Sequence, residues 1–340
     1  MTTPKPHYVS FHIIDRCDAR CRHCDIWRRK ADLEMPPDFY PDIARQISRW
    51  LGPVEIQIAG GEPLLSRNVP ILIEAARDLH LPVSMTTNAY HLDDDWAERL
   101  SRWEVRYVNI SLDGFRETHD RNRGVEGYFK AATEAAARLT GLGKVKPRVT
   151  CVIFKDNLGE IVEFTEWVCR QSKLFDGIFF QAMAQPFGND YKPEWWKKAT
   201  LWPDDHELLG HVLGRLLEMK TAGYPILNRN EQFAAMRRYF RHPENFSLAK
   251  CTVGEKGVTI GPEGSVRMCP YDPPVGNVLE KDLRTIWEGY EARNLRKKMS
   301  NCRTNCHLLM NCVFDKTQLI PESAPVDNIP PREIASVTAS

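Results

Sequence analysis

Residues 8–24 read YVSFHIIDRCDARCRHC, a short apolar run followed at once by three cysteines. The apolar and β-branched residues of Tyr8–Ile13 predict a strand. The cysteines follow it with the spacing C-x3-C-x2-C, at Cys17, Cys21 and Cys24. A loop that leaves the end of a strand can wrap three thiolates around an iron–sulfur cubane. These residues therefore predict a cluster site at the carboxyl edge of a sheet.

The number of cysteines in this first group is informative. A structural zinc site is usually closed by four ligands. Three thiolates instead leave one iron of a [4Fe–4S] cluster open to a substrate or a cofactor. A zinc knuckle and cysteines without a metal role are the alternatives. The motifs further along the chain favour the cluster with an open iron.

Composition and charge exclude several classes of protein. The chain has 340 residues, of which 42% are hydrophobic and 27% charged, with a net charge of +1. It can bury a sizeable core, and its charge gives no case for nucleic acid or a membrane surface as partner. We see neither a signal peptide nor a membrane-spanning run, so we expect a cytoplasmic protein. Ten cysteines in such a chain indicate metal ligands or catalytic groups rather than a disulfide frame.

Short apolar runs alternate with helical patterns through the first 180 residues. The candidate strands are Tyr8–Ile13, Val54–Ile58, Val83–Met85, Tyr107–Ser111, Arg148–Phe154 and Gly177–Phe180. The helical stretches between them lie near residues 38–51, 68–79, 93–102, 127–141 and 157–171. This alternation predicts a parallel sheet with right-handed crossovers. We expect an α/β fold, a partial (β/α)6 barrel with ligands at the carboxyl ends of the strands.

The character of the chain changes after this core, which we assign to residues 1–184. Residues 185–245 predict a loop and helical connection, with helices near 203–219 and 231–240. Residues 246–316 predict a small C-terminal module of a β-hairpin and a helix. Its elements are expected at Gly257–Ile260, Ser265–Met268 and residues 281–298. Residues 317–340 form a Pro-rich tail.

Polar motifs follow three of the other candidate strands. Gly-Gly-Glu-Pro at residues 60–63 follows the second, and its glycines allow the backbone to approach a ligand closely. Thr-Thr-Asn at 86–88 follows the third. Ser-Leu-Asp-Gly at 111–114 follows the fourth, and His-Asp-Arg-Asn-Arg-Gly at 119–124 comes just after. Arg123 offers a fork that suits a carboxylate. Ordinary turns and a salt-bridged surface arginine are the alternatives.

In this order, the four motifs resemble those of the radical S-adenosylmethionine superfamily. The resemblance covers about residues 8–180. It implies that the open iron of a [4Fe–4S] cluster chelates S-adenosyl-L-methionine through its amino and carboxylate groups. An electron from the cluster then gives a 5′-deoxyadenosyl radical, which abstracts a hydrogen atom from the substrate. An external one-electron reductant of the flavodoxin or ferredoxin type is implied as a partner.

The resemblance also implies roles for individual side chains around that cofactor. Glu62 would contact its amino group, Arg123 its carboxylate, and Ser111 would donate a hydrogen bond to it. His23 falls where the family usually has an aromatic residue near the adenine, and Ala89 stands where glycine is common. The full set expected to contact the cofactor is His23, Gly60, Gly61, Glu62, Asn88, Ser111, Asp113 and Arg123.

The second group of cysteines resembles the SPASM and twitch extensions, which bind auxiliary iron–sulfur clusters. It comprises Cys251, Cys269 and the run Cys302-x3-Cys306-x5-Cys312. Two [4Fe–4S] clusters need eight thiolates, so these five imply one auxiliary cluster and a spare cysteine. Cys251 and Cys269 are the firm pair, and two of the other three complete the set. A zinc ribbon and a second auxiliary cluster with a non-cysteine ligand are the alternatives.

The resemblance leads first to an enzyme that acts on a small or medium-sized metabolite. Oxidation of an alcohol to a ketone is the first hypothesis, with the auxiliary cluster accepting the second electron. Epimerisation, ring contraction or another carbon-skeleton rearrangement would use the same radical. Such a reaction can need a hydrogen donor, for which Cys151 or the spare among Cys302, Cys306 and Cys312 are candidates.

Two other functions remain open. One is modification of a ribosomal peptide by a crosslink or thioether. Enzymes of that kind commonly carry an N-terminal peptide-recognition domain, whereas the cluster motif here begins at residue 17, which lowers this hypothesis. The other is a non-catalytic iron–sulfur electron carrier, against which the cofactor motifs argue.

Overall fold

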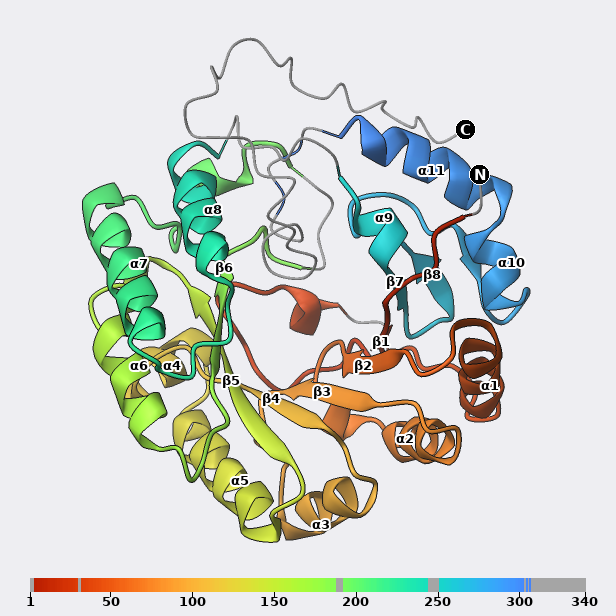
Figure 1. The fold of residues 1–340 in the computed structure, drawn as a ribbon, viewed down its shortest axis with the longest axis horizontal. Helices are drawn as coiled ribbons and strands as arrows, with labels where there is room; N and C mark the ends of the chain where they lie inside the picture. The colour runs from red at the N-terminus through yellow and green to blue at the C-terminus, as the bar shows by residue number, and fades with distance from the viewer. Residues whose placement is uncertain are drawn as a thin grey trace.

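A mixed sheet forms the centre of the molecule. The computed structural model describes residues 3–29, 32–187, 192–243, 251–302, 304 and 306. Six parallel strands lie side by side in reverse chain order, from one edge of the sheet inward. They are β6 (Ile178–Ala182), β5 (Lys146–Ile153), β4 (Tyr107–Ser111), β3 (Val83–Thr87), β2 (Glu55–Ala59) and β1 (Tyr8–His12). The predicted α/β fold with a parallel sheet is confirmed (Figure 1).

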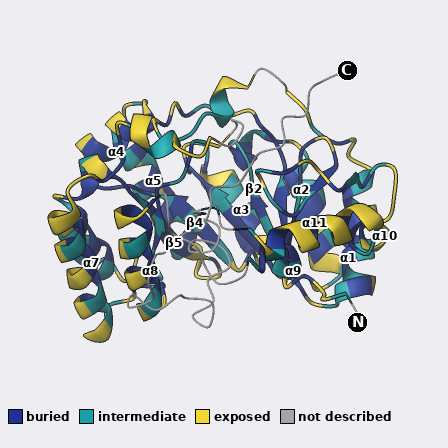
Figure 2. Cartoon of the chain, turned by 90° about the horizontal axis from the view of Figure 1, so that it is seen from above, coloured by how far each residue is buried: buried dark blue, intermediate teal, exposed yellow. Residues whose placement is uncertain are grey.

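Helices connect the successive strands and cover their outer side (Figure 1). The crossover helices are α1 (Phe39–Leu51), α2 (Val69–Asp78), α3 (Asp94–Arg102), α5 (Tyr128–Leu142) and α6 (Ile161–Arg170). Each presents buried residues to the strands and exposed residues to solvent (Figure 2). An extra helix, α4 (Arg116–Arg123), was not predicted because its sequence RETHDRNR has no apolar periodicity. Its buried side chains are polar, since it lies against the candidate site.

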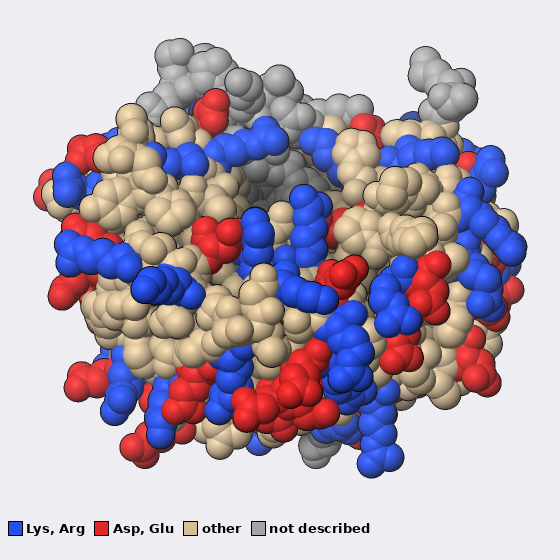
Figure 3. Space-filling model, turned by 60° about the horizontal axis from the view of Figure 1, so that its bottom comes forward, with Lys and Arg blue, Asp and Glu red and all other residues tan. Residues whose placement is uncertain are grey.

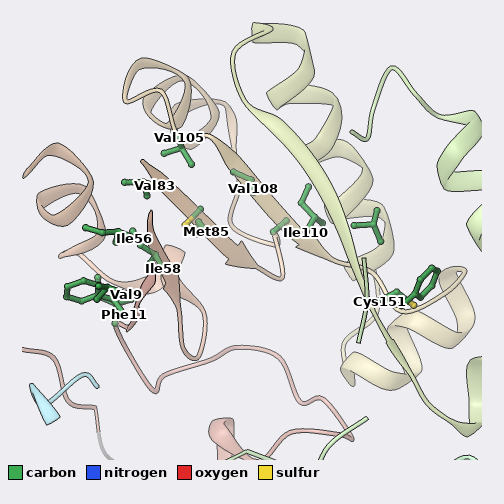
Figure 4. Close-up of a cluster of buried hydrophobic side chains, with 14 of the residues drawn as sticks. Val9, Phe11, Ile56, Ile58, Val83, Met85, Val105, Val108, Ile110 and Cys151 are labelled. Carbon is green, nitrogen blue, oxygen red and sulfur yellow. The ribbon is translucent and has the colours of Figure 1, made fainter. Parts of the chain in front are cut away.

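Side chains of the parallel strands alternate between two environments, as strand geometry requires. One set packs against the helices and is buried, and Figure 4 shows part of it, from Val9 and Phe11 on β1 to Cys151 on β5. The other set faces the inner side of the sheet and is largely polar. Members of that set are Ser10, Gln57, Thr86, Asn109, Thr150 and Gln181.

The C-terminal hairpin continues the same sheet. Strand β7 (Gly257–Ile260) pairs in parallel with β1, with Tyr8 opposite Gly257. Strand β8 (Ser265–Arg267) then pairs antiparallel with β7, and β9 (Gly276–Asn277) with β8. The hairpin was predicted, but its union with the core sheet was not. A Cβ atom at position 257 would lie 2.2 Å from Cζ of Tyr8, so this seam needs glycine there.

The predicted helix near 281–298 is two helices, α10 (Leu283–Trp287) and α11 (Tyr290–Ser300), which Gly289 separates. A shorter helix, α9 (Val253–Lys256), leads into β7. Trp287 is fully buried, and its indole nitrogen donates a hydrogen bond to the carbonyl of Pro4 at 2.8 Å. The module is therefore anchored to the start of the chain as well as to β1.

At the opposite edge of the sheet, α7 (His206–Thr221) and α8 (Asn230–Arg241) pack beside α6 and β6 (Figure 1). The Trp202 ring packs against Tyr239 in a tilted arrangement and against Phe240 in an edge-on one, so the segment before α7 is bound to the core. No helix among the described residues is long and apolar enough to cross a bilayer. Cys312 and the predicted Pro-rich tail lie outside the described residues.

Candidate active site

The loop that carries Cys17, Cys21 and Cys24 follows β1, and the Gly-Gly-Glu motif at residues 60–62 binds the backbone of this loop. The amide of Gly61 donates to the carbonyl of Ile14 at 2.6 Å, and that of Glu62 to Arg16 at 2.9 Å. A Cβ atom on Gly61 would lie 2.3 Å from the Arg16 carbonyl oxygen, and one on Gly60 would lie 2.6 Å from that of Ile14. Because neither glycine has a side chain, the backbone of the cysteine loop can pack directly against them. The motif positions the first site through backbone contact.

The end of α4 holds the same loop from the other side. The amides of Arg20 and Arg22 donate to the carbonyls of Arg123 and Asn122, at 2.8 and 2.9 Å. Gly124 caps α4 with a φ of +69°, and a Cβ atom there would lie 2.8 Å from Cβ of Arg20. Two motifs that are distant in sequence therefore clamp the cysteine loop.

The three thiols lie in a partly buried environment with Tyr128. Burial is the largest cause that raises the pKa of Cys17 to about 12 and that of Cys24 to about 11, and it also raises the pKa of Cys21. Arg123 opposes this at Cys21, because its Nη1 atom lies 3.6 Å from the sulfur. Such thiols ionise readily only beside a strong positive charge, such as iron. The donor set therefore fits a metal cluster.

Among the described residues, no three Cys, His, Asp or Glu side chains lie close enough together to hold one metal ion. A single zinc ion would need its sulfurs roughly 3.8 Å apart, given Zn–S bonds of about 2.3 Å in a tetrahedron. Thiolates of a [4Fe–4S] cluster each bind a different iron atom and need no such convergence.

Glu62 is buried and joins the ends of β2 and β3. It accepts hydrogen bonds from the amide of Leu64 at 3.0 Å, the hydroxyl of Thr87 at 2.6 Å and the amide of Asn88 at 2.8 Å. Burial raises its pKa to about 7 despite these bonds. The side chain of Asn88 in turn donates to Asp18 in the cysteine loop at 2.9 Å. Contact of Glu62 with a cofactor amino group stays a prediction. The structure adds a second role, because the Glu62 carboxylate joins the ends of β2 and β3 by hydrogen bonds.

Asp113 and Arg123 form a buried ion pair behind the cysteine loop, with 2.8 Å between Oδ2 and Nη2. Burial opposes ionisation of Asp113, but the Arg123 charge and hydrogen bonds outweigh it and hold the pKa of Asp113 below its ordinary value. Asp113 is fully buried, and its contact with a cofactor stays a prediction. The Nε atom of Arg123 is a buried donor with no partner among the described residues. It suits an anionic group of a cofactor.

His23 and Ser111 are two further residues that were predicted to contact the cofactor. The His23 ring is close to Asn122 and stacks on Phe154, with 6.3 Å between ring centres. Ser111 is at the carboxyl end of β4, half-buried, and no hydrogen bond joins its hydroxyl to the part of the chain that the structure describes. Both side chains stay predicted cofactor contacts.

The structure brings three of the second group of cysteines together. Burial is the largest cause that raises the pKa of Cys269 to about 12, and the nearby Cys251 and Cys302 raise it further. Cys302 therefore lies near the expected pair, and its role as a ligand stays a prediction. Cys306 is buried in the core, and Cys312 lies outside the described residues. Which two of Cys302, Cys306 and Cys312 complete the ligand set stays a prediction.

Cys151 belongs to the helix-facing side of β5 and is fully buried among apolar side chains (Figure 4). Its sulfur lies 3.8 Å from Nδ2, the side-chain amide nitrogen of Asn157. This position favours a core residue over the hydrogen donor that was one hypothesis. All nine described cysteines are free thiols, so none of them belongs to a disulfide.

Two site residues were missed by the reasoning from sequence, namely Asn122 and Asn157. Asn122 joins His23 to Asp113, and Asn157 donates to the carbonyl of Asp113 at 2.8 Å. Asn122 stands inside the motif at 119–124, which was a usable signal. Nothing around Asn157 in the sequence marks it.

Comparison with known proteins agrees with this geometry. The family model described as the radical SAM superfamily matches residues 11–168, and one described as an iron–sulfur cluster-binding domain, SPASM, matches residues 251–312. Fe-coproporphyrin III synthase of Methanosarcina barkeri is 29% identical over 83% of this chain and 74% of its own length. Mycofactocin maturase MftC of Mycolicibacterium smegmatis is 24% identical over 87% of this chain and 74% of its own.

A solved structure shares the fold. Streptococcus suis SuiB bound to S-adenosylmethionine superposes with a TM-score of 0.68 at 17% identity. The match covers 86% of this chain and 68% of that one.

Proposed function

Because the chain belongs to the radical S-adenosylmethionine superfamily and carries a SPASM domain, we propose that it oxidises an organic substrate by radical chemistry. The family's cofactors are a [4Fe–4S] cluster, S-adenosyl-L-methionine and an auxiliary cluster. When bound together, the first two supply a one-electron oxidant that removes a hydrogen atom from the substrate.

In this proposal Cys17, Cys21 and Cys24 hold the first cluster. The close backbone contacts at Gly61 and Gly124 hold the cysteine loop in place before the cluster binds. Cluster binding therefore costs less conformational entropy. Arg123 is the residue we propose for the cofactor's carboxylate. Its unpaired Nε donor and its bond to Asp113 support that role.

Cys251, Cys269 and Cys302 are proposed ligands of the auxiliary cluster, with Cys306 or Cys312 as the fourth. By the register of the sheet, Cys251 and Cys269 lie near the amino end of β7, whereas the first loop leaves the carboxyl end of β1. One strand of five residues spans on the order of 15 Å. This shared seam is the observation that carries the proposal, because an electron released at one site has an acceptor within the same sheet.

The substrate is proposed to lie on the polar inner face of the parallel strands. A space-filling view shows the molecule hollowed on one face, with Lys and Arg side chains at the rim (Figure 3). Polar side chains such as Gln57, Asn109 and Gln181 can orient a substrate by hydrogen bonds.

The class of substrate is taken from the relatives. An iron-bearing tetrapyrrole is our first candidate, because the relative that is 29% identical over most of this chain is named for such a product. The sequence led first to oxidation of an alcohol in a small or medium-sized metabolite, and the names of these two relatives do not test that reaction. A peptide is the second candidate, favoured by the similarity to mycofactocin maturase. Alcohol oxidation remains the form of the reaction that we propose for a substrate with a hydroxyl group.

The test uses anaerobically reconstituted protein with reductant and S-adenosyl-L-methionine. Iron tetrapyrroles, with Fe-coproporphyrin III as the product standard, and a peptide encoded beside the gene are supplied in turn, and 5′-deoxyadenosine and product mass are measured. We expect one of them to stimulate 5′-deoxyadenosine formation and to give an oxidised product. A Cys269→Ala variant should still cleave the cofactor but yield little oxidised product. A product of unchanged mass would contradict oxidation and favour epimerisation or rearrangement.

A further inference from the structure

His12 ends β1 on the inner face of the sheet, at the edge from which the first cysteine loop departs. Val9 and Phe11 of the same strand belong to the set that packs against the helices (Figure 4), so the alternation of a strand turns Ser10 and His12 to the inner side. The His12 side chain is half-buried, and no hydrogen bond joins its ring to the described part of the chain. The ring is therefore available to a molecule bound on this face.

The C-terminal hairpin brings two more polar side chains to the same position. The register of β1 and β7 places Gly261 beside His12, and the amide of Gly261 donates to the carbonyl of Ser265 at 2.8 Å. A Cβ atom on Gly261 would lie 2.6 Å from Oγ of Ser265 and 3.0 Å from Oε2 of Glu263. That Oγ atom is buried and has no hydrogen-bond partner among the described residues. Because Gly261 has no side chain, polar groups of β1 and of the hairpin share one space on the inner face.

Four charged groups act on the His12 ring, two from the segment after β1 and two from the hairpin. Asp15 and Arg29 form an ion pair at 3.0 Å, and Glu263 and Arg267 flank the turn into β8. Burial is the largest cause that lowers the pKa of His12 below its ordinary value of 6.5. Asp15 and Glu263 act against this shift, and Arg29 and Arg267 add to it. The ring is therefore neutral at pH 7 and can accept a proton.

Other titratable side chains near the first site already have partners. Glu62 accepts three hydrogen bonds, Asp113 pairs with Arg123, and His119 accepts a hydrogen bond from the amide of Asp113. Oxidation of a substrate releases a proton as well as an electron, and a positioned base takes that proton. Of Glu62, Asp113, His119 and His12, only His12 has no hydrogen-bond partner within the described residues.

We propose that His12 is the catalytic base that takes the proton released when the substrate is oxidised. The proposal rests on the proposed function. For an alcohol, the carbinol C–H bond gives its hydrogen atom to the 5′-deoxyadenosyl radical. The O–H bond then gives its proton to His12, one electron passes to the auxiliary cluster, and the C–O bond becomes C=O. Two hydrogens and two electrons leave the substrate in total, and His12 lies on the strand that joins the two cysteine groups.

The experiment compares wild type, His12→Gln and a matched control, His211→Gln, which makes the same change on the exposed face of α7. Each protein is reconstituted anaerobically and given reductant, S-adenosyl-L-methionine and, in turn, iron tetrapyrroles and the peptide encoded beside the gene. The measurements are iron content, 5′-deoxyadenosine and oxidised product. The ratio of oxidised product to 5′-deoxyadenosine separates loss of the base from loss of the radical.

We expect His12→Gln to keep its iron and to form 5′-deoxyadenosine within about twofold of wild type. Its oxidised product per 5′-deoxyadenosine should fall at least tenfold, because a general base contributes about 100-fold or more to a rate. The His211→Gln control should match wild type. If His12→Gln loses iron, His12→Asn is measured in the same way.

Three results would overturn the proposal, and they differ in what else they overturn. An unchanged ratio in His12→Gln would remove His12 as the base and leave the proposed oxidation intact. An equal loss of 5′-deoxyadenosine and product would show that His12 serves binding or the fold instead. No oxidised product from the wild type with any of these substrates would defeat the proposed function, and the role of His12 with it.

Discussion

At the scale of single residues, Ala89 takes a conformation that favours glycine. Its φ is +64°, and its side chain is buried directly after the Thr-Thr-Asn motif. The sequence resemblance already marked this position as one where relatives commonly have glycine. A left-handed alanine costs about 1 kcal/mol or more in steric strain.

We therefore expect Ala89→Gly to raise the free energy of unfolding by about 0.5–1 kcal/mol, after the entropy of glycine is allowed for. Urea unfolding of the reconstituted protein measures it. The matched control is Ala97→Gly, the same change at a buried position inside α3, which should instead lower stability by about 1 kcal/mol. Loss of stability in both variants would contradict a strained Ala89.

His119 gives the site a dependence on pH. Its Nδ1 atom accepts a hydrogen bond from the amide of Asp113 at 3.1 Å, and burial, followed by the Arg123 charge, lowers its pKa to about 3. The folded state therefore keeps it neutral, whereas the unfolded chain binds a proton below about pH 6.5. Because the folded pKa is lowered, the stability it confers is present above pH 6.5 and falls as pH drops toward 3.

The expected slope from this one group is at most about 1.4 kcal/mol per pH unit. His119→Asn keeps an acceptor for the Asp113 amide and removes the titration. We expect the variant to lose less stability than the wild type between pH 7 and 5, as measured by urea midpoints. Parallel pH profiles for the two proteins would show that His119 is not the group responsible.

The residue scale also shows what sequence patterns leave undetermined. Cys17, Cys21 and Cys24 could be grouped from their spacing alone. The carboxylates of Glu62 and Asp113 were both expected to contact cofactor, yet each already accepts several hydrogen bonds from the protein. Those donors come from other strands and loops, so no local pattern records them.

At the scale of elements, the seam between β1 and β7 is the feature least visible in the sequence. The strands that alternate with helices could be predicted because apolar runs mark each one locally. The pairing of β7 with β1 joins residues about 250 positions apart, as in Tyr8 and Gly257, and no local signal encodes such a contact. Helix α4 could not be predicted from apolar periodicity, because its buried side chains are polar and lie against the candidate site.

The seam predicts a specific sensitivity at Gly257. A Cβ atom there would meet the Tyr8 ring, so Gly257→Ala should lower the free energy of unfolding by about 1–3 kcal/mol, the usual cost of overpacking. Much of that loss should disappear in a Tyr8→Ala background, where the obstructing ring is gone. The control is Gly141→Ala in α5, which has open space around it and should be neutral or stabilising. An effect at Gly257 no larger than that control would argue against the close contact.

At the scale of the whole molecule, one continuous sheet carries two separate groups of cysteines. The first group is clamped between the ends of β2 and α4, and the second gathers around the start of β7. The sequence predicted both groups from spacing and resemblance. Their relation along a shared seam could come only from the strand pairing. In the proposed function, this arrangement separates the site that starts radical chemistry from the one that would receive an electron.

The measurement that tests this account most directly is 5′-deoxyadenosine formation by three anaerobically reconstituted proteins given reductant and S-adenosyl-L-methionine. The account predicts formation by the wild type, none by Cys17→Ala, and continued formation by Cys269→Ala with a lower iron content. No product from the wild type, or as much from Cys17→Ala as from the wild type, would contradict it.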